Sequence, residues 1–400
     1  MKVLIWDKGI PLKNTGGPSG YLFNIHEYWK DHQREEITFY SDLFNSKLGG
    51  NEITDTSHSF IERLLSIKFF KFCYSLYSIY FKKELLSENE IDVINEYDFI
   101  HIHTFSQYMT SFANEKRINS RIIVTTHCPE PCFDEVCGLF QYKTLFKVLF
   151  PIRSWFIKRE CNKLSVADYI LLPVKEAVEA YTCCSRHYKR FFNSNDNKLL
   201  FVPTAIYPSD IVVTNNNPLE NFSISDDTLK VCFVGRHNQI KGYDKLKEIG
   251  LEAIRRNIDV HFIVGGKEEP LKGIDSERWT ELGWVNTFEV LNNVDVFILP
   301  NKQTYFDLIL IEVLRQGKTC IISRTGGNKW FSKFHNTGIF LYDYGKEDEV
   351  IDILTYLIEL KKQGGLGELE KQNRGVFLNY LTLSKFIDAY INQLNMICPK

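Results

Sequence analysis

The 400-residue sequence lacks long hydrophobic runs and has little excess charge of either sign. Its most apolar stretch, Phe69 to Phe81, is interrupted by Lys71 and is shorter than the roughly 18 residues that a membrane span requires. Lys and Arg number 48 and Asp and Glu number 50, so the net charge of −2 excludes a general attraction to nucleic acid. The apolar run at the N-terminus stops at Asp7, too early for the core of a signal peptide, and we therefore expect a cytoplasmic protein.

Cysteine pairs with the spacing C-x-x-C are also absent, although the sequence has ten cysteines. In a reducing compartment these thiols are expected to be free. His127, Cys128, Cys132 and Cys137 lie close together in the sequence, which leaves a zinc site as an alternative. Their spacing matches no standard zinc pattern, so buried thiols are the favoured interpretation.

Hydrophobic residues make up 44% of the chain, enough to bury a large core and to exclude a disordered or fibrous protein. Short apolar runs alternate with longer amphipathic segments, which is typical of βαβ units and parallel sheets. The expected strands are residues 3–6, 37–40, 99–103, 122–126, 169–173, 230–235, 260–265, 294–300 and 319–323. The expected helices of the first half are residues 20–30, 61–86 and 145–167.

Residues 214–227 are polar and rich in Asn, and this composition indicates a linker between two halves. We expect an α/β protein with two Rossmann-like, doubly wound domains, 1–213 and 228–375, that face each other across a crevice. A second break at residues 364–367 precedes one last helix, of which residues 376–400 are expected to pack back on the first domain.

The second half carries the strongest functional pattern, a predicted strand that leads into Arg236 and then into Lys241 and Gly242. Two cations beside the free N–H groups of a helix N-terminus form a suitable cradle for a diphosphate, although solvated loop charges would look the same. Further on, Glu312 follows an apolar helical run that ends at Gly317. A carboxylate there can accept hydrogen bonds from the vicinal hydroxyls of a ribose, and an ordinary polar helix position is the alternative.

The motifs of this half follow one another as Val-Gly-Arg236…Lys241-Gly, Leu-Pro300…Glu312…Gly317, Ser323 and Gly326-Gly327. In this order and spacing they resemble the donor-binding half of family 4 retaining glycosyltransferases of the GT-B fold. The resemblance implies that Arg236 and Lys241 hold the diphosphate of a nucleotide sugar and that Glu312 binds the ribose.

This sequence departs from the family pattern at one position. The family has a glutamate eight residues before the position of Glu312, where this chain has Thr304. That glutamate usually contacts the donor sugar, so the identity of the sugar stays open. Thr304 can hydrogen-bond a different sugar, and Asp307 is a second candidate for part of this role.

The first half adds candidates under the same resemblance. Gly16 and Gly17 lie in a Gly-rich loop before a helix, and in the family this loop lies against the diphosphate and the acceptor. His127 follows a predicted strand at a place where the family commonly has a histidine that contacts the donor sugar. His101 and His103 stay candidates only, because a single histidine at a strand end is more often structural.

Positive charge is concentrated in two aromatic-rich segments, with net charges of +5 over residues 143–163 and +3 over residues 60–85. Such segments are typical of helices on an anionic membrane surface, and core-facing helices with snorkelling lysines are the alternative.

We therefore expect a glycosyltransferase that moves a sugar from a nucleotide-diphosphate donor to a glycan or lipid-linked acceptor, with retention, in polysaccharide or glycoconjugate biosynthesis. No metal or other cofactor is expected, and the protein is expected in the cytoplasm, with the inner face of the membrane as the alternative. A sugar-nucleotide epimerase and a catalytically silent subunit that binds a partner glycosyltransferase are the rival functions. The expected catalytic residues are His127, Arg236 and Lys241, and the expected donor-binding residues are Gly16, Gly17, Arg236, Lys241, Thr304, Asp307 and Glu312.

Overall fold

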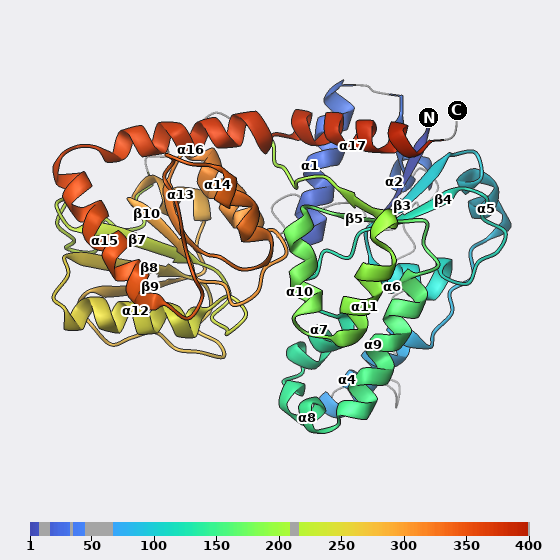
Figure 1. Ribbon diagram of the computed structural model, residues 1–400, viewed down its shortest axis with the longest axis horizontal. Helices are drawn as coiled ribbons and strands as arrows, with labels where there is room; N and C mark the ends of the chain where they lie inside the picture. Colours follow the sequence, from blue (N-terminus) through green and yellow to red (C-terminus); the bar gives the residue numbers. More distant parts are fainter. Residues whose placement is uncertain (8–16, 33–34, 45–66, 209–215, 399–400) are drawn as a thin grey trace, which may run out of the picture. The chain divides into compact units, whose positions relative to one another are not determined.

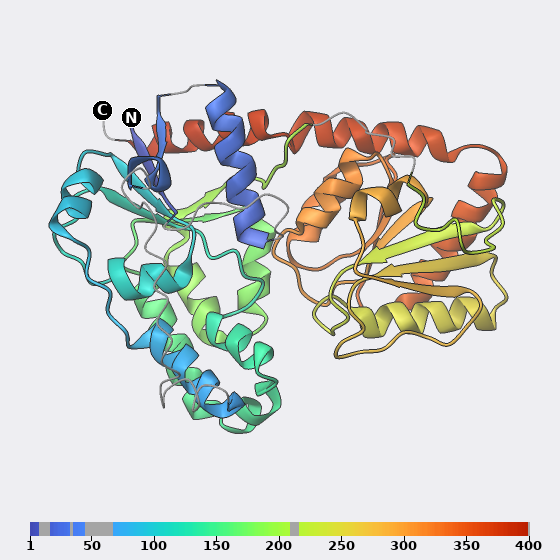
Figure 2. The ribbon, with the colours of Figure 1, turned by 180° about the vertical axis from the view of Figure 1, so that it is seen from behind.

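The computed structural model describes residues 1–7, 17–32, 35–44, 67–208 and 216–398. The chain divides into two compact units, each built around a six-stranded parallel sheet (Figures 1 and 2). Unit 1 contains Met1–Leu172, Ala180–Val202 and Ala389–Lys400, and unit 2 contains Pro173–Glu179 and Pro203–Asp388.

The sheet of unit 1 has the strand order β2-β1-β3-β4-β5-β6. Its strands are β1 (Val3–Trp6), β2 (Ile37–Phe39), β3 (Phe99–Ile102), β4 (Arg121–Val124), β5 (Tyr169–Leu172) and β6 (Leu199–Phe201). The helices of this part of the chain are α1 (Gly17–His32), α2 (Tyr40–Phe44), α4 (Lys68–Tyr80), α5 (Glu88–Ile94), α6 (Phe105–Gln107), α7 (Cys132–Leu139), α8 (Lys143–Val148), α9 (Phe150–Leu164), α10 (Glu179–Thr182) and α11 (Arg186–Ser194). The π-helical turn η2 (Tyr108–Phe112) and the 3₁₀ helices η3 (Lys175–Val178) and η4 (Asp196–Lys198) lie between them, and η3 belongs to unit 2.

The sheet of unit 2 has the strand order β12-β11-β10-β7-β8-β9. Its strands are β7 (Leu229–Val234), β8 (Val260–Gly265), β9 (Trp279–Gly283), β10 (Val296–Leu299), β11 (Thr319–Ser323) and β12 (Ile339–Tyr342). The helices are α12 (Tyr243–Arg255), α13 (Thr287–Asn292), α14 (Leu308–Arg315), α15 (Glu347–Lys362), α16 (Leu366–Tyr380) and α17 (Leu383–Ile397), with the 3₁₀ helix η5 (Gly326–Lys333). Helix α12 covers one face of the sheet and α13 and α14 cover the other (Figures 1 and 2).

The core of unit 2 explains why these segments form parallel strands and helices. Val231, Phe262 and Ile298 point from neighbouring strands into one cluster with Leu246 of α12 and Leu354 of α15, and all are buried. Strands that are covered on both faces require continuous apolar runs rather than alternation, which is the pattern that the sequence shows. Strands β7 and β10 are neighbours in this sheet, and the direction in which successive strands are added reverses between them.

The predicted doubly wound α/β architecture is confirmed, and every one of the nine predicted strands is present within one to two residues at each end. Three strands, β6, β9 and β12, were not predicted. All three lie at a sheet edge, and each contains side chains that are only partly buried. Only β9, with the sequence Trp-Thr-Glu-Leu-Gly, lacks a continuous apolar run, whereas β6 and β12 are short apolar runs that were not assigned as strands.

Two predicted helices are each divided in the structure. The helix expected over residues 145–167 is two helices, because Pro151 cannot continue a helix and starts α9 in its first turn. The single last helix is α16 followed by α17, separated where Ile206 accepts a hydrogen bond from Leu383 and donates one to Leu381. The C-terminal part of α17 belongs to unit 1, where the hydroxyl of Tyr390 lies 2.9 Å from Nδ1 of His101.

Residues 61–66 of the helix predicted over 61–86 lie outside the described residues, as do residues 214 and 215 of the predicted linker. Residues 216–227 of that linker contain turns and irregular backbone and belong to unit 2.

Candidate functional site

The loop after β7 brings Arg236 and Lys241 to the carboxyl end of the sheet in unit 2. Its conformation depends on Gly242, whose φ of +66° is in the left-handed region and which directly precedes α12. The side chain of Asn238 accepts a hydrogen bond from the backbone N–H of Lys241 at 3.0 Å, which fixes the end of the loop.

The loop after the neighbouring strand β10 packs directly against the β7 loop. A Cβ atom on Gly242 would lie 1.6 Å from the carbonyl oxygen of Pro300, so only glycine allows the two backbones to approach this closely. The N–H of Lys302 donates to the carbonyl of Ile240 at 3.0 Å across the same contact. The two loops therefore form one rigid surface at the point where the strand order of the sheet reverses.

Lys241 and Asp307 form the charged centre of this surface. Nζ of Lys241 lies 2.8 Å from Oδ1 of Asp307, and both side chains are mostly buried. The amide of Asn301 donates to the other carboxylate oxygen of Asp307. A lysine held in this way keeps donors available for an anion while its own position is restrained.

The loop after β11 packs against the β10 loop on the side away from the β7 loop. The hydroxyls of Ser323 and Thr325 both donate to the carbonyl of Asn301, at 2.6 and 3.0 Å. Gly326 and Gly327 lie against the carbonyl oxygens of Thr304 and Tyr305 so closely that a Cβ atom would be only 2.1 and 2.0 Å from them. Gly326 and Gly327, noted in the sequence as part of a motif, thus bring the segment around Thr304 into place.

Several buried polar atoms of this cluster have no hydrogen-bond partner within the described part of the chain. They are Oγ1 of Thr304, Oδ1 of Asn301 and Oδ1 of Asn328, and all three side chains are at most 1% exposed. A buried polar group without a partner costs free energy, so such groups are most often found where a ligand or water completes them.

The side chains of Arg236 and Glu312 form no hydrogen bond or ion pair with the described residues of this cluster. The guanidinium of Arg236 is exposed, and among the described residues it has no ion-pair partner. Glu312 lies on α14, and burial raises the pKa of its carboxyl group while the nearby charge of Arg315 opposes the shift. Both groups are thus available to a ligand that reaches beyond the Lys241–Asp307 pair.

His237 is a residue of this site that the sequence analysis missed. It lies between Arg236 and Lys241 in the sequence. Its ring is fully buried and stacks on the ring of Tyr243, with the ring centroids 4.0 Å apart. Burial lowers its pKa, although Glu281, 3.8 Å away, opposes the shift. Its place between the two predicted cations was the only available signal, and its ring packs on Tyr243, the first residue of α12.

Unit 1 brings three predicted histidines together at the carboxyl ends of β3 and β4. Nε2 of His127 lies 3.0 Å from Nδ1 of His103, and the rings of His103 and His101 are 3.9 Å apart. Burial lowers the pKa of His127 to about 4 and that of His101 to about 3. The His127 backbone has φ of +52°, which is unusual for a residue other than glycine. Neutral rings in contact require that one donates a proton and the other accepts it.

The two glycines of the loop predicted to lie against the diphosphate and the acceptor are only partly described. Gly16 lies outside the described residues, and Gly17 is the first residue of α1.

Comparison with known proteins agrees with this architecture. Residues 228–359, about a third of the chain, match the model of the family Glycosyl transferases group 1. Sucrose-phosphate synthase from Thermosynechococcus elongatus is similar over 99% of both chains, with 13% identity and a TM-score of 0.61. HepE from Anabaena in complex with UDP is similar over 99% of this chain and 100% of that one, with 11% identity and a TM-score of 0.58. The chain has the GT-B fold.

TarM is a third similar structure, with 13% identity and a TM-score of 0.53 over 81% of this chain. The chain spans only 57% of the length of TarM. No curated protein has a significantly similar sequence. The matched domain and the GT-B fold together support a glycosyltransferase.

The residues that match the group 1 model contain all three loops of the cluster. Lys241, Thr304 and Asp307 are predicted site residues that the loops bring together, whereas no polar contact joins the side chains of Arg236 and Glu312 to the described residues of the cluster. Among the described residues no helix is long and apolar enough to cross a membrane.

The thiols near His127 show no arrangement of a metal site. Cys128 and Cys137 are buried, Cys132 is half-buried, and all three are free. The described residues contain no group of three or more His, Cys, Asp or Glu side chains that could hold a metal ion.

Proposed function

We propose that this GT-B protein transfers a sugar from a nucleotide-diphosphate donor to a glycan or lipid-linked acceptor, with retention of the anomeric configuration. The observation that carries the proposal is the cluster of Lys241, Asp307 and Thr304 between β7 and β10. Ligands of open α/β sheets bind at the carboxyl ends of the strands where the strand order reverses, which is where this cluster lies. The match of residues 228–359 to group 1 glycosyltransferases favours a nucleotide sugar as the ligand.

In this proposal the diphosphate binds to the cations of the β7 loop. Arg236 has no partner among the described residues, and Lys241 is held by Asp307 beside the N-terminus of α12. As the bond between the sugar and the phosphate breaks, negative charge develops on the leaving diphosphate, and these cations stabilise it. No step of this kind needs a metal ion, so we propose that the protein's own cations supply the positive charge.

Sugar and ribose recognition are assigned to different residues. The buried hydroxyl of Thr304 has no partner within the described part of the chain, so it is available to a hydroxyl group of the donor sugar. Glu312 is assigned to the ribose, because a carboxylate can accept hydrogen bonds from two vicinal hydroxyls. His127 is assigned to the sugar, with His103 as its neighbour.

The first experiment measures the binding of UDP, GDP and ADP by thermal shift and calorimetry. UDP is the first choice, because HepE is a structural neighbour in complex with UDP and with UDP-glucose. A ligand that binds only the folded protein raises its stability, by about 2.7 kcal/mol at a hundredfold excess over Kd. Failure of all nucleoside diphosphates to bind would contradict the proposed donor class.

Variants then test the assigned cations. Arg236→Ala and Lys241→Ala are each expected to lower kcat/KM roughly 30-fold to 1,000-fold. This corresponds to a loss of about 2–4 kcal/mol of transition-state stabilisation. Lys272→Ala is the matched control, because Lys272 is an exposed lysine of the same unit that lies outside the cluster. Rates within twofold of the wild type for both test variants would show that the diphosphate binds elsewhere.

A second pair of variants tests the division of roles. Glu312→Gln is expected to weaken the binding of UDP alone, whereas Thr304→Ala is expected to change only turnover or the choice of donor sugar. An equal loss of UDP affinity in both variants would contradict this division. Conversion of the donor without an acceptor would instead indicate an epimerase, and donor binding without any turnover would indicate a silent subunit.

A further inference from the structure

Helices α4, α8 and α9 of unit 1 bring the two basic segments of the sequence together in one place. Phe72 of α4 packs against Phe146 of α8, and Phe81, directly after α4, stacks on Trp155 of α9 at 6.0 Å. The guanidinium of Arg159 lies near both of the latter rings, at 5.5 and 5.7 Å. Residues 60–66 of the predicted basic segments lie outside the described residues.

The outer side of α4 is an aromatic stripe. Phe70, Tyr74, Tyr77 and Phe81 recur at intervals of three or four residues, so they lie on one side of the helix, and all are exposed. The inner side holds Phe72, Leu76 and Tyr80, which are buried. Helix α4 thus faces the core on one side, as the alternative interpretation of a core-facing helix expects, and presents aromatic residues to solvent on the other side.

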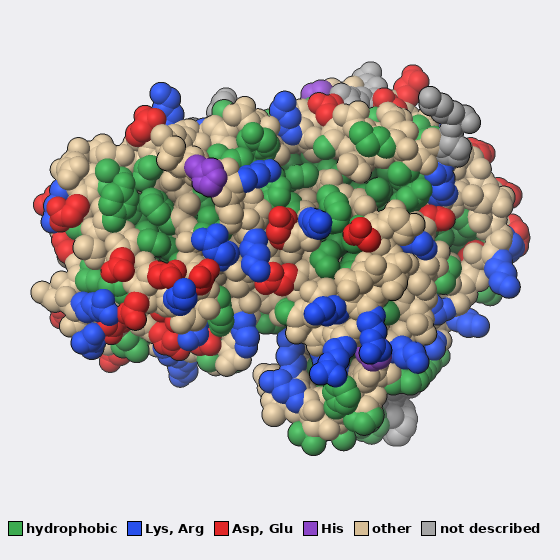
Figure 3. Space-filling model, viewed as in Figure 1, with side chains coloured by type: hydrophobic (Ala, Val, Ile, Leu, Met, Phe, Trp, Pro, Cys, Tyr) green, Lys and Arg blue, Asp and Glu red, His purple; other side chains and the backbone are tan. Residues whose placement is uncertain are grey.

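The junction of α8 and α9 exposes further large apolar side chains. Val148 is 79% exposed and Phe150 is 60% exposed, and Leu145, Ile152 and Trp155 are also exposed. Together with the stripe of α4 they form what we term the basic aromatic face, which consists of the exposed residues of α4, α8 and α9 with Phe81 and Leu149. Figure 3 shows hydrophobic and basic side chains together over this tip of unit 1.

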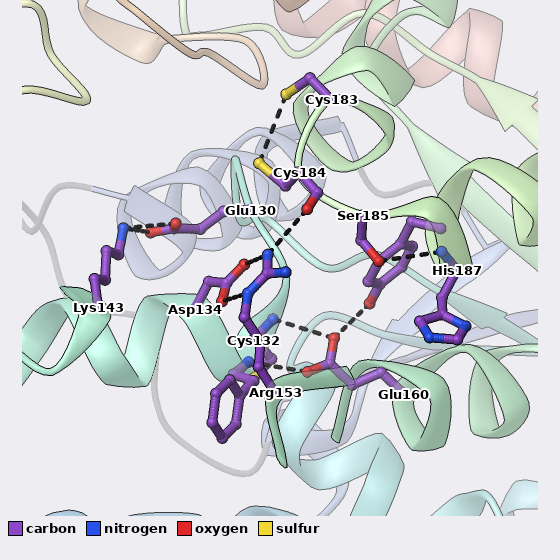
Figure 4. Close-up of polar contacts among 12 residues, drawn as sticks. Glu130, Cys132, Asp134, Lys143, Arg153, Glu160, Cys183, Cys184, Ser185 and His187 are labelled. Carbon is purple, nitrogen blue, oxygen red and sulfur yellow. Dashed lines mark hydrogen bonds and ion pairs between the residues drawn. The ribbon is translucent and has the colours of Figure 1, made fainter. Parts of the chain in front are cut away.

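The structure corrects which charges belong to this face. Arg153, counted among the surface cations in the sequence, forms two hydrogen bonds to Asp134 at 2.7 and 2.5 Å and a third to the carbonyl of Cys184 (Figure 4). Lys143 pairs with Glu130 at 2.7 Å. These two cations hold α7, α8 and α9 together and carry no unbalanced charge to the surface.

The one acidic residue of α4, α8 and α9 is also internal. Glu160 is fully buried and accepts hydrogen bonds from Tyr188 and from the backbone N–H groups of Cys132 and Phe133 (Figure 4). It therefore does not offset the surface charge. Lys71, Lys147 and Lys158 remain exposed, and within the described residues none of them has an acidic partner.

We propose that the basic aromatic face docks on the surface of an anionic lipid bilayer. Exposed aromatic and aliphatic side chains enter the headgroup region, and the lysines between them attract anionic headgroups. The chain as a whole has a net charge of −2, so this local excess of positive charge is complementary to an anionic surface rather than a property of the whole protein. Helices α4, α8 and α9 lie together at one end of unit 1, away from its sheet (Figure 2). This inference does not depend on the proposed transfer reaction.

Vesicle co-sedimentation of the full chain tests the proposal without any nucleotide. Vesicles of equimolar phosphatidylglycerol and phosphatidylcholine are expected to sediment the protein, and vesicles of phosphatidylcholine alone are expected to leave it in solution. Raising the salt from about 0.15 M to about 1 M shortens the Debye length from roughly 8 Å to roughly 3 Å and should release it. Wild-type protein that stays in solution with anionic vesicles at low salt would overturn the proposal.

Matched variants test whether this face is responsible. Reversal of Lys71, Lys147 and Lys158 to Glu is expected to lower the partition coefficient at least a hundredfold, since each basic side chain contributes about fivefold. The control reverses the exposed Lys272, Lys371 and Lys385 of unit 2, which changes the net charge equally and should leave binding unchanged. Equal losses in both triple variants would overturn the assignment to this face.

A third variant, Phe70→Ser with Val148→Ser, tests insertion rather than attraction. It should weaken binding to anionic vesicles about tenfold or more, and circular dichroism should show an unchanged fold because both side chains are exposed. Light scattering measures the oligomeric state and so tests whether a second copy of the chain, rather than a bilayer, covers this face. A wild-type dimer that this variant converts to a monomer would show that a second copy of the chain covers the face, and would overturn the bilayer as its occupant. UDP binding, measured separately, shows whether a failed docking test leaves the proposed transfer function intact.

Discussion

Replacing Gly242 with alanine tests whether the close approach of the β7 and β10 loops determines the stability of unit 2. Gly242 has φ of +66°, where a residue with a Cβ atom costs about 1–2 kcal/mol relative to glycine. The new Cβ atom would also lie 1.6 Å from the carbonyl oxygen of Pro300, whereas Cβ contacts in proteins are not shorter than 3.0 Å. The Pro300 segment would have to move away by the difference, and such overpacking costs typically 1–3 kcal/mol.

Gly283→Ala is the matched control for this prediction. Gly283 has nearly the same backbone angle, with φ of +69°, but a Cβ atom there has no neighbour within 4 Å. The control should therefore lose only the backbone contribution of about 1–2 kcal/mol, whereas Gly242→Ala should lose roughly 2–5 kcal/mol. The difference between the two variants isolates the contact with Pro300.

Urea denaturation of both variants, followed by tryptophan fluorescence, measures the two free energies of unfolding. The wild-type slope against urea must be retained for the comparison to hold. Because Asn301 follows Pro300 and contacts Asp307, we also expect weaker UDP binding in Gly242→Ala and unchanged binding in the control. Equal destabilisation by the two substitutions would refute the argument that the contact with Pro300 excludes a side chain at position 242.

Three further predictions follow from individual contacts. Asp307→Asn should tighten UDP binding about fivefold in calorimetry, which is near 1 kcal/mol, because the charge of Lys241 is then no longer shared with a carboxylate. An unchanged affinity would count against Lys241 as the phosphate ligand. Burial raises the pKa of Glu160 to about 7, so the folded protein binds this proton more tightly than the unfolded chain and loses stability as pH rises from 4.5 to 7. Relative to Glu160→Gln, which cannot titrate, the wild type should lose roughly 3 kcal/mol over this window in urea titrations, and parallel pH profiles would contradict the shift. His103→Ala should lower kcat about tenfold with little change in KM. His103→Asn can replace the contact to His127 and should restore most of the lost kcat. A kcat that His103→Asn does not restore would indicate a purely structural role.

Most of the fold could be predicted from the sequence, because central parallel strands are covered on both faces and require continuous apolar runs. The runs at 3–6, 260–265 and 319–323 coincide with strands β1, β8 and β11. The edge strand β9 could not be predicted in this way, because its polar residues interrupt the apolar run, whereas the short apolar runs of β6 and β12 carried the signal and were not assigned. The division between α8 and α9 could have been predicted from Pro151, which the hydrophobic pattern alone did not reveal.

For the site, the sequence by itself determined which residue types follow each strand: Arg236 and Lys241 after β7, Asp307 after β10 and His127 after β4. These placements depend on local order along the chain. Only the tertiary structure decided that Lys241 pairs with Asp307, 66 residues away, and that Gly242 lies against Pro300. It also decided that Arg153 and Glu160 are internal, so that neither contributes to the basic aromatic face. The physical reason is that local periodicity determines which side of an element is buried, whereas a charge becomes internal only when a distant segment supplies its partner.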